Sequence, residues 1–106
     1  MALVKGTLDV LVLKALASQP KHAFEITQWI EARSGGRLMV EDAALMQALH
    51  RMEERKLVSA SWAMTEKERR ARYYRVTAAG RAHYRAESER LTEYADVLVA
   101  ILGART

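Results

Sequence analysis

Four cationic side chains lie close together in one short polar segment of the chain. They are Lys67, Arg69, Arg70 and Arg72, and from Lys67 to Arg85 the sole acidic residue is Glu68. Flexible cations in such a segment can bind phosphate oxygens or enter a minor groove of DNA. A solvated turn is the alternative, but clustered arginines with so little acid nearby favour phosphate. We therefore predict that these four residues bind DNA.

A second set of candidate binding residues precedes this segment. Leu45, Leu49 and Met52 recur at i, i+4 and i+7, which predicts a helix over Glu41–Arg55 with an apolar inner face. Glutamine can pair with adenine, methionine can contact a thymine methyl group, and arginine can bind guanine or phosphate. A surface helix of mixed polarity fits this segment equally well. The candidate DNA contacts on the outer face are Ala44, Met46, Gln47, His50 and Arg51.

The elements around these residues follow from a change of period. After Leu57, apolar residues alternate at Val58, Ala60, Trp62 and Met64, which is strand spacing, and Arg72–Val76 is a second β-prone run. These segments predict a hairpin whose tip spans Met64–Arg72. A helix followed by a hairpin with a cationic tip is typical of a winged helix-turn-helix protein.

Two further helices are predicted upstream. Thr7–Ala17 has apolar residues on more than one face and ends before Gln19-Pro20, because the residue before proline is disfavoured in a helix. Ala23–Ser34 has helical spacing and stops at Gly35-Gly36. We expect Arg37–Val40 to be a short connection, and we expect Trp29 and Trp62 to lie in the core or at an interface.

The C-terminal segment predicts one long helix. Thr77 is a plausible N-cap, and nothing from Arg81 to Leu102 breaks the helical pattern. Its second half carries an apolar stripe that so small a chain has nothing left to cover, so we expect it to form the seam of a homodimer. The predicted dimer residues are Leu91, Tyr94, Leu98, Ile101 and Leu102.

Composition limits the remaining function classes. The chain has 106 residues, a net charge of +4, a pI near 9.7 and no cysteine, and its three histidines are far apart. No metal site, cofactor, catalytic group or membrane-spanning stretch is expected from these residues. We expect one ordinary domain in the cytoplasm that is not an enzyme.

Four segments together resemble the PadR family of bacterial transcriptional regulators, in the family's order and over nearly the whole chain. The single C-terminal helix resembles its smaller subfamily. The resemblance implies a homodimer of winged helix-turn-helix domains, usually a repressor, and some members bind small aromatic molecules at the dimer interface. The segments are Lys5-Gly-Thr-Leu-Asp-Val-Leu-Val-Leu-Lys-Ala-Leu16, His22-Ala-Phe-Glu-Ile26, Ala48-Leu-His-Arg-Met-Glu53 and Tyr73-Tyr-Arg-Val-Thr-Ala-Ala-Gly80.

Two departures from the family pattern leave a second hypothesis open. Ala43-Ala44-Leu45-Met46-Gln47 stands where the family usually has Gly-Thr-Leu-Tyr-Pro, and Ala23-Phe24 stands where it has Gly-Tyr. Both changes remove hydroxyl groups that can reach phosphates or bases. The alternative is therefore a dimeric ligand- or protein-binding module with weakened specific DNA readout. In either case the predicted ligand residues, between subunits, are Trp29 and Tyr94.

The predicted fold is mainly α with a small β-hairpin: a winged helix-turn-helix plus a long C-terminal dimerisation helix. Residues 1–76 would form the DNA-binding domain and residues 77–106 the dimerisation helix. The expected partners are double-stranded DNA, a second copy of the chain and, in the effector-responsive case, a small aromatic molecule.

Overall fold

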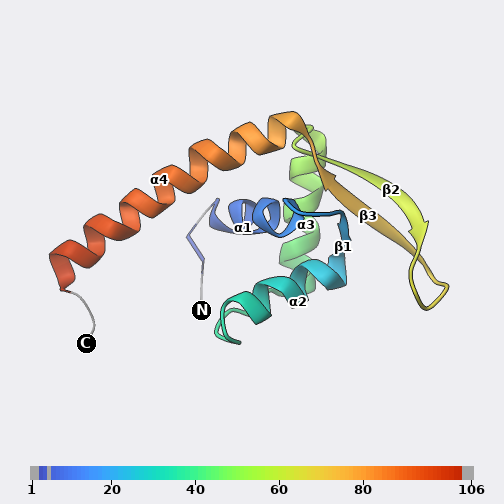
Figure 1. The fold of residues 1–106 in the computed structure, drawn as a ribbon, viewed down its shortest axis with the longest axis horizontal. Helices are drawn as coiled ribbons and strands as arrows, with labels where there is room; N and C mark the ends of the chain where they lie inside the picture. The colour runs from blue at the N-terminus through green and yellow to red at the C-terminus, as the bar shows by residue number, and fades with distance from the viewer. Residues whose placement is uncertain (1–2, 5, 104–106) are drawn as a thin grey trace.

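A computed structural model describes residues 3–4 and 6–103 of the chain. The outer ends of the predicted regions 1–76 and 77–106, and Lys5 of the first family segment, lie outside the described residues. The elements follow in the order α1 (Thr7–Leu16), β1 (Lys21–His22), α2 (Ala23–Arg33), α3 (Asp42–Glu54), β2 (Val58–Met64), β3 (Arg70–Val76) and α4 (Ala78–Leu102) (Figure 1). This is the predicted mainly α winged helix, with one strand more than the sequence indicated.

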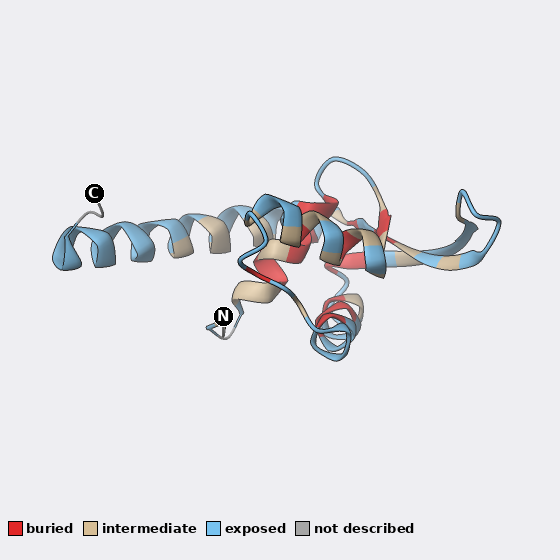
Figure 2. Ribbon diagram, turned by 90° about the horizontal axis from the view of Figure 1, so that it is seen from below, coloured by how far each residue is buried: buried red, intermediate tan, exposed pale blue. Residues whose placement is uncertain are grey.

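Helix α1 is the centre of the core. Its Val12 and Leu13 are almost fully buried, and α1 contacts α2, α3 and α4, which explains why its apolar residues are not confined to one stripe. Helix α3 contributes the inner face that its spacing predicted, Leu45, Leu49 and Met52. Burial is concentrated where these helices meet the root of the hairpin, whereas the far half of α4 and the hairpin tip are exposed (Figure 2).

The sheet has three antiparallel strands in the order β1-β3-β2. Strands β2 and β3 pair from Val58↔Val76 to Met64↔Arg70, which confirms the hairpin, although β3 begins at Arg70 and not at Arg72. The third strand, β1, was missed. It is two residues long and pairs with β3 through Lys21↔Tyr74. Two residues cannot show a period of two, so no sequence pattern marks this strand.

Lys21 explains why β1 lies against α1. Its residue is only 6% exposed, and its Nζ donates a hydrogen bond of 2.5 Å to the carbonyl oxygen of Ala15. Carbonyl groups in the last turn of a helix lack helical partners and carry partial negative charge. The buried ammonium group therefore caps the end of α1 and ties the following strand to it.

Helix α4 starts at a tight junction with the root of the hairpin. Thr77 is the N-cap, as predicted: its hydroxyl accepts a hydrogen bond from the Gly80 backbone N–H at 3.0 Å and donates to the Lys56 carbonyl at 2.7 Å. A Cβ atom on Gly80 would lie 2.0 Å from the carbonyl oxygen of Leu57, so only glycine fits there. No helix in the described part of the chain is long and apolar enough to cross a membrane.

Candidate nucleic-acid interface

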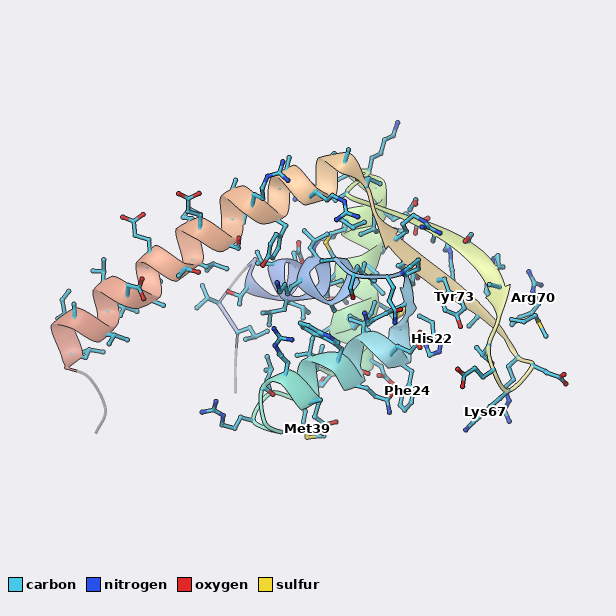
Figure 3. The ribbon with its side chains drawn as sticks, viewed as in Figure 1. His22, Phe24, Met39, Lys67, Arg70 and Tyr73 are labelled. Atoms are coloured by element: carbon cyan, nitrogen blue, oxygen red, sulfur yellow. The ribbon has the colours of Figure 1, made fainter. Side chains whose placement is uncertain are left out.

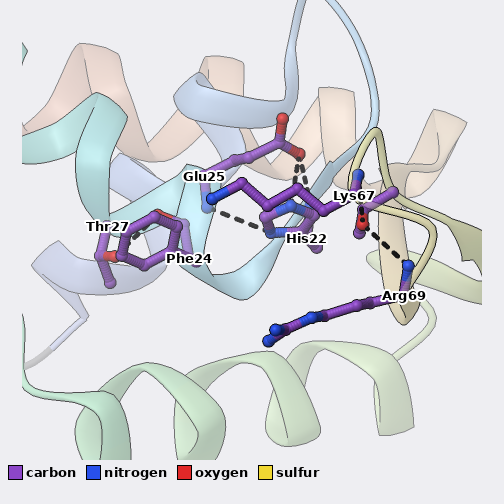
Figure 4. Close-up of polar contacts among 7 residues, drawn as sticks. His22, Phe24, Glu25, Thr27, Lys67 and Arg69 are labelled. Atoms are coloured by element: carbon purple, nitrogen blue, oxygen red, sulfur yellow. Dashed lines mark hydrogen bonds and ion pairs between the residues drawn. The ribbon is translucent and has the colours of Figure 1, made fainter.

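The tip of the hairpin has a defined shape that presents two cations. Between the strands, the backbone N–H of Thr65 donates to the carbonyl of Arg69 at 2.8 Å, and the Thr65 hydroxyl oxygen accepts from the N–H groups of Lys67 and Arg69 at 3.2 Å each. Glu68 adopts a left-handed conformation with φ of 58° to close the turn. The exposed side chains of Lys67 and Arg69 therefore extend from an ordered turn (Figures 3 and 4).

Arg70 and Arg72, which the sequence placed at the tip, belong to strand β3 and have partners. The guanidinium carbon of Arg70 lies 4.8 Å from the centre of the Trp62 ring. Arg72 donates a 2.6 Å hydrogen bond to the carboxylate of Glu53 on α3, and its guanidinium carbon is 6.0 Å from the ring centre of Tyr74. Arg70 remains exposed and can bind phosphate, whereas Arg72 also connects the hairpin to helix α3.

The two tryptophans were predicted to lie in the core or at an interface. Trp62 does not lie in the core. Its exposed fraction is 59%, because only the first residues of β2, from Val58, lie against the core and the rest of the strand extends away from it. Trp29 is half-buried and packs against the core, with the guanidinium carbon of Arg33 5.1 Å from its ring centre.

The predicted outer face of α3 is exposed as expected. Ala44, Met46, Gln47 and His50 all face solvent, while the residues between them are buried. His50 has Glu54 as a neighbour, 3.6 Å away on the next turn. This helix therefore offers one amide at Gln47 and one thioether at Met46 as groups able to contact base edges.

Arg51, the fifth predicted contact on α3, has a partner that sequence reasoning missed. Its Nη2 donates to Oδ1 of Asp9 at 2.9 Å, and Asp9 is only 8% exposed. The one available signal was an acidic residue inside the apolar run of α1, which favours a buried pair. The pair lies in an open groove of about 720 Å³ between the start of α1, the connection after α2, and α3.

The start of α2 faces the hairpin tip. His22 is its N-cap: its Nδ1 accepts from the Glu25 N–H at 3.3 Å, while Glu25 Oε1 accepts from the His22 N–H at 3.1 Å. The two contacts form a capping box at the start of α2. Its ring meets Tyr73 edge-on at 5.3 Å. A groove of about 560 Å³ separates this helix start from Lys67 and Arg69 (Figure 4).

Most residues predicted for the dimer lie in the part of α4 that extends away from the core (Figure 1). Leu91 is half-buried, whereas Tyr94, Leu98, Ile101 and Leu102 are exposed. Tyr94 and Trp29, the predicted ligand residues, lie on different helices, α4 and α2. The described residues include no group of three side chains arranged to hold a metal ion.

Comparison with known proteins agrees with this architecture. A solved transcriptional regulator from Clostridium thermocellum is 21% identical, with a TM-score of 0.83 over 93% of this chain and 96% of its own. A PadR family transcription regulator from Clostridium difficile is 21% identical, with a TM-score of 0.77 over 92% of this chain and 100% of its own. An uncharacterized protein from Lysinibacillus sphaericus is 26% identical over 95 residues, 90% of this chain and 84% of that protein.

One further relative was solved with its ligand. Bacillus subtilis PadR, in complex with operator DNA, is 13% identical and has a TM-score of 0.66 over 74% of this chain and 46% of its own. At these identities the solved structures establish the fold. The family is established by the sequence itself, since residues 12–86 match the model of the transcriptional regulator PadR-like family. The chain therefore belongs to the PadR-like family of transcriptional regulators.

Proposed function

We propose that this chain is a dimeric transcriptional regulator, of the repressor type, that binds operator DNA through α3 and the wing, defined here as residues 64–72. The observation that carries the proposal is the pair of exposed cations, Lys67 and Arg69, on an ordered turn at the wing tip. Cations held in this way bind phosphate with little loss of backbone freedom. The operator complex of Bacillus subtilis PadR supports the assignment.

The two parts of the interface differ in what they contribute. Lys67, Arg69 and Arg70 supply positive charge that any duplex attracts. On α3, Gln47 is the residue best suited to distinguish bases, whereas Ala44 and Met46 offer no hydrogen-bond donor to a base edge. Arg51 is held by Asp9 on the side of α1. We therefore infer that phosphate contacts dominate affinity and that sequence discrimination is modest.

Dimerisation is assigned to α4, with residues 77–106 as the dimerisation region. The exposed fractions of Ile101 and Leu102 are 74% and 80%, and those of Leu98 and Tyr94 are 39% and 58%. Apolar side chains three and four residues apart on one helix form a stripe that a second copy can cover. A dimer places two wings on one DNA molecule, and a dimer seated on an operator blocks access to it.

A second function is favoured by the apolar groups at Ala44 and Met46, where the family motif carries hydroxyls. On this proposal the chain is a dimeric ligand- or protein-binding module, and Trp29 and Tyr94 supply aromatic surface between subunits. The same two residues would serve an effector-responsive regulator. Titration with planar cationic dyes tests the ligand site: an unchanged tryptophan emission and an unchanged melting temperature across a varied panel count against it.

A mobility-shift assay at two salt concentrations tests DNA binding. The probes are the duplex upstream of the chain's own gene and a scrambled duplex of the same length. Lys67→Ala and Arg69→Ala should weaken binding to both duplexes alike, each lowering the slope of log affinity against log salt by about one. Arg90→Ala removes an exposed cation of α4 as a control and should leave the slope unchanged. Failure of the wild type to bind either duplex at low salt favours the second function.

A further inference from the structure

One face of the β2–β3 hairpin carries aromatic, apolar and cationic side chains together. Residues paired across antiparallel strands project to the same side, so Ala60 and Tyr74, Trp62 and Arg72, and Met64 and Arg70 share a face. Near the root, Tyr74 is buried at 3% exposure. Further out on the same face, Trp62 and Met64 are each 59% exposed.

The Trp62 ring lies beside the guanidinium group of Arg70. Arg70 lies 4.8 Å from its centre, and Arg72 is its direct partner across the strands, held in place by Glu53 at 2.6 Å. A cation over an aromatic ring is an attractive contact that orients both groups. Trp62 is therefore an exposed ring that is positioned by Arg70 and that lies opposite Arg72 across the two strands.

Charged residues of the β2–β3 hairpin are concentrated on one of its two strands. Strand β2, Val58–Met64, has no charged residue, whereas β3 carries Arg70, Arg72 and Arg75. A lone exposed apolar side chain would mean little. Here two neighbouring apolar residues share their face with two arginines, on the element that already carries the tip cations. A surface of that kind matches a polyanion that has apolar groups between its charges.

We propose that Trp62 is an uncharged DNA contact of the β2–β3 hairpin, packing its indole against the deoxyribose carbons of one DNA strand while Arg70 and Arg72 bind the flanking phosphates. Residues two apart on a strand are about 7 Å apart, close to the separation of successive phosphates. Bases inside a duplex are already stacked, so the sugar is the apolar surface within reach. This inference rests on the proposed function and adds to it a contribution that does not depend on salt.

The first measurement is affinity against salt for Trp62→Ala, Trp62→Tyr and Arg69→Ala. Trp62→Ala should weaken binding to operator and scrambled duplexes alike by roughly fivefold to tenfold, the effect of burying roughly 40 to 55 Å² of apolar surface. Its salt slope should equal that of the wild type, whereas Arg69→Ala should lose about one unit of slope. Trp62→Tyr keeps an aromatic ring and should recover most of the affinity.

The second measurement is fluorescence. The wild type contains Trp29 and Trp62, so the difference between its emission and that of Trp62→Phe reports Trp62 alone. That difference in emission should change when DNA is added. The DNA concentration at half of the change should equal the one that gives half-saturation by mobility shift. Sedimentation and melting temperatures of Trp62→Ala and Trp62→Phe check that their assembly and folding are intact.

The outcomes separate the two proposals. Wild-type binding that Trp62→Ala leaves unchanged, with no change in Trp62 emission, overturns the inference but keeps the DNA-binding function. A Trp62→Ala variant that dissociates into monomers shows that a second copy covers the ring, and also overturns it. A wild type that binds no duplex at low salt overturns both proposals.

Discussion

The guanidinium group of Arg51 lies 2.9 Å from the carboxylate of Asp9 and joins α3 to α1. The Asp9 side chain is 11% exposed and that of Arg51 is 53% exposed, so the carboxylate belongs to the interior and the cation extends out to meet solvent. The pair thus fixes α3 against the core while drawing a candidate DNA contact toward α1.

Replacing Asp9 with asparagine should expose this double role. Asparagine keeps an acceptor oxygen but not the negative charge, and the weaker hydrogen bond should lower the free energy of unfolding by about 1 to 2 kcal/mol. The same change frees Arg51 for phosphate, so binding to a scrambled duplex should strengthen. Urea unfolding and mobility shift measure the two effects. Asp96→Asn changes an exposed carboxylate on α4 and should alter neither, and a variant of Asp9 with wild-type stability would contradict the structural role.

Base discrimination is predicted to depend on Gln47. Gln47→Ala should cost roughly 1 to 3 kcal/mol of binding free energy on the preferred duplex and leave binding to a scrambled duplex nearly unchanged. Gln19→Ala, which removes an exposed amide from the connection between α1 and β1, is the matched control. Competition binding with the two duplexes gives the ratio directly. An equal loss on both duplexes would mean that Gln47 contacts phosphate instead.

The dimer should depend on Leu98. Burial of a leucine side chain contributes about 1.5 to 3 kcal/mol, and a dimer buries it twice, so Leu98→Asp should yield monomer or unfolded protein. Ala100→Asp introduces the same charge on the opposite side of α4 and should leave the dimer intact. Sedimentation at micromolar concentration distinguishes the species. A wild type that sediments as a monomer there would refute the assignment of α4.

Stability at high pH should depend on Tyr74. Burial raises the pKa of its phenol above the ordinary value of 10.0, against the opposing effect of Arg72, which lowers that pKa. The unfolded chain then loses this proton at lower pH than the folded chain. The contribution of the protonated Tyr74 phenol to the free energy of unfolding is therefore complete below about pH 10. It is lost as the pH rises from there toward the pKa of the folded chain.

Tyr74→Phe has no proton to lose and should flatten that decline. Urea unfolding between pH 8 and 11 measures the slope of the free energy of unfolding against pH. Tyr94→Phe, at an exposed position, is the control and should keep the wild-type slope. Equal slopes for Tyr74→Phe and the wild type would show that other groups cause the decline.

Helical periodicity predicted the four helices because α1, α2 and α3 bury regular apolar faces and α4 carries a regular apolar stripe that is largely exposed. Thr77 marked the start of α4. Contacts between distant residues left no such mark. Asp9 and Arg51 are 42 positions apart, and Lys21 reaches the end of α1 through a strand of two residues. Trp62 shows another limit: alternation identifies a strand, but it does not say where that strand leaves the core. The sequence therefore suggested which residues to consider for the candidate site, while the pairings among them required coordinates.

The fit of Gly80 against Leu57 has a mechanical consequence. Because no Cβ atom fits between them, and Thr77 binds the same turn, α4 cannot pivot on the hairpin root without breaking those contacts. Helix α4 has 25 residues and extends away from the core, so it is a long helix held rigidly at its start (Figure 1). In the proposed dimer, any change in the crossing angle of the two α4 helices would therefore change the distance between the two wings.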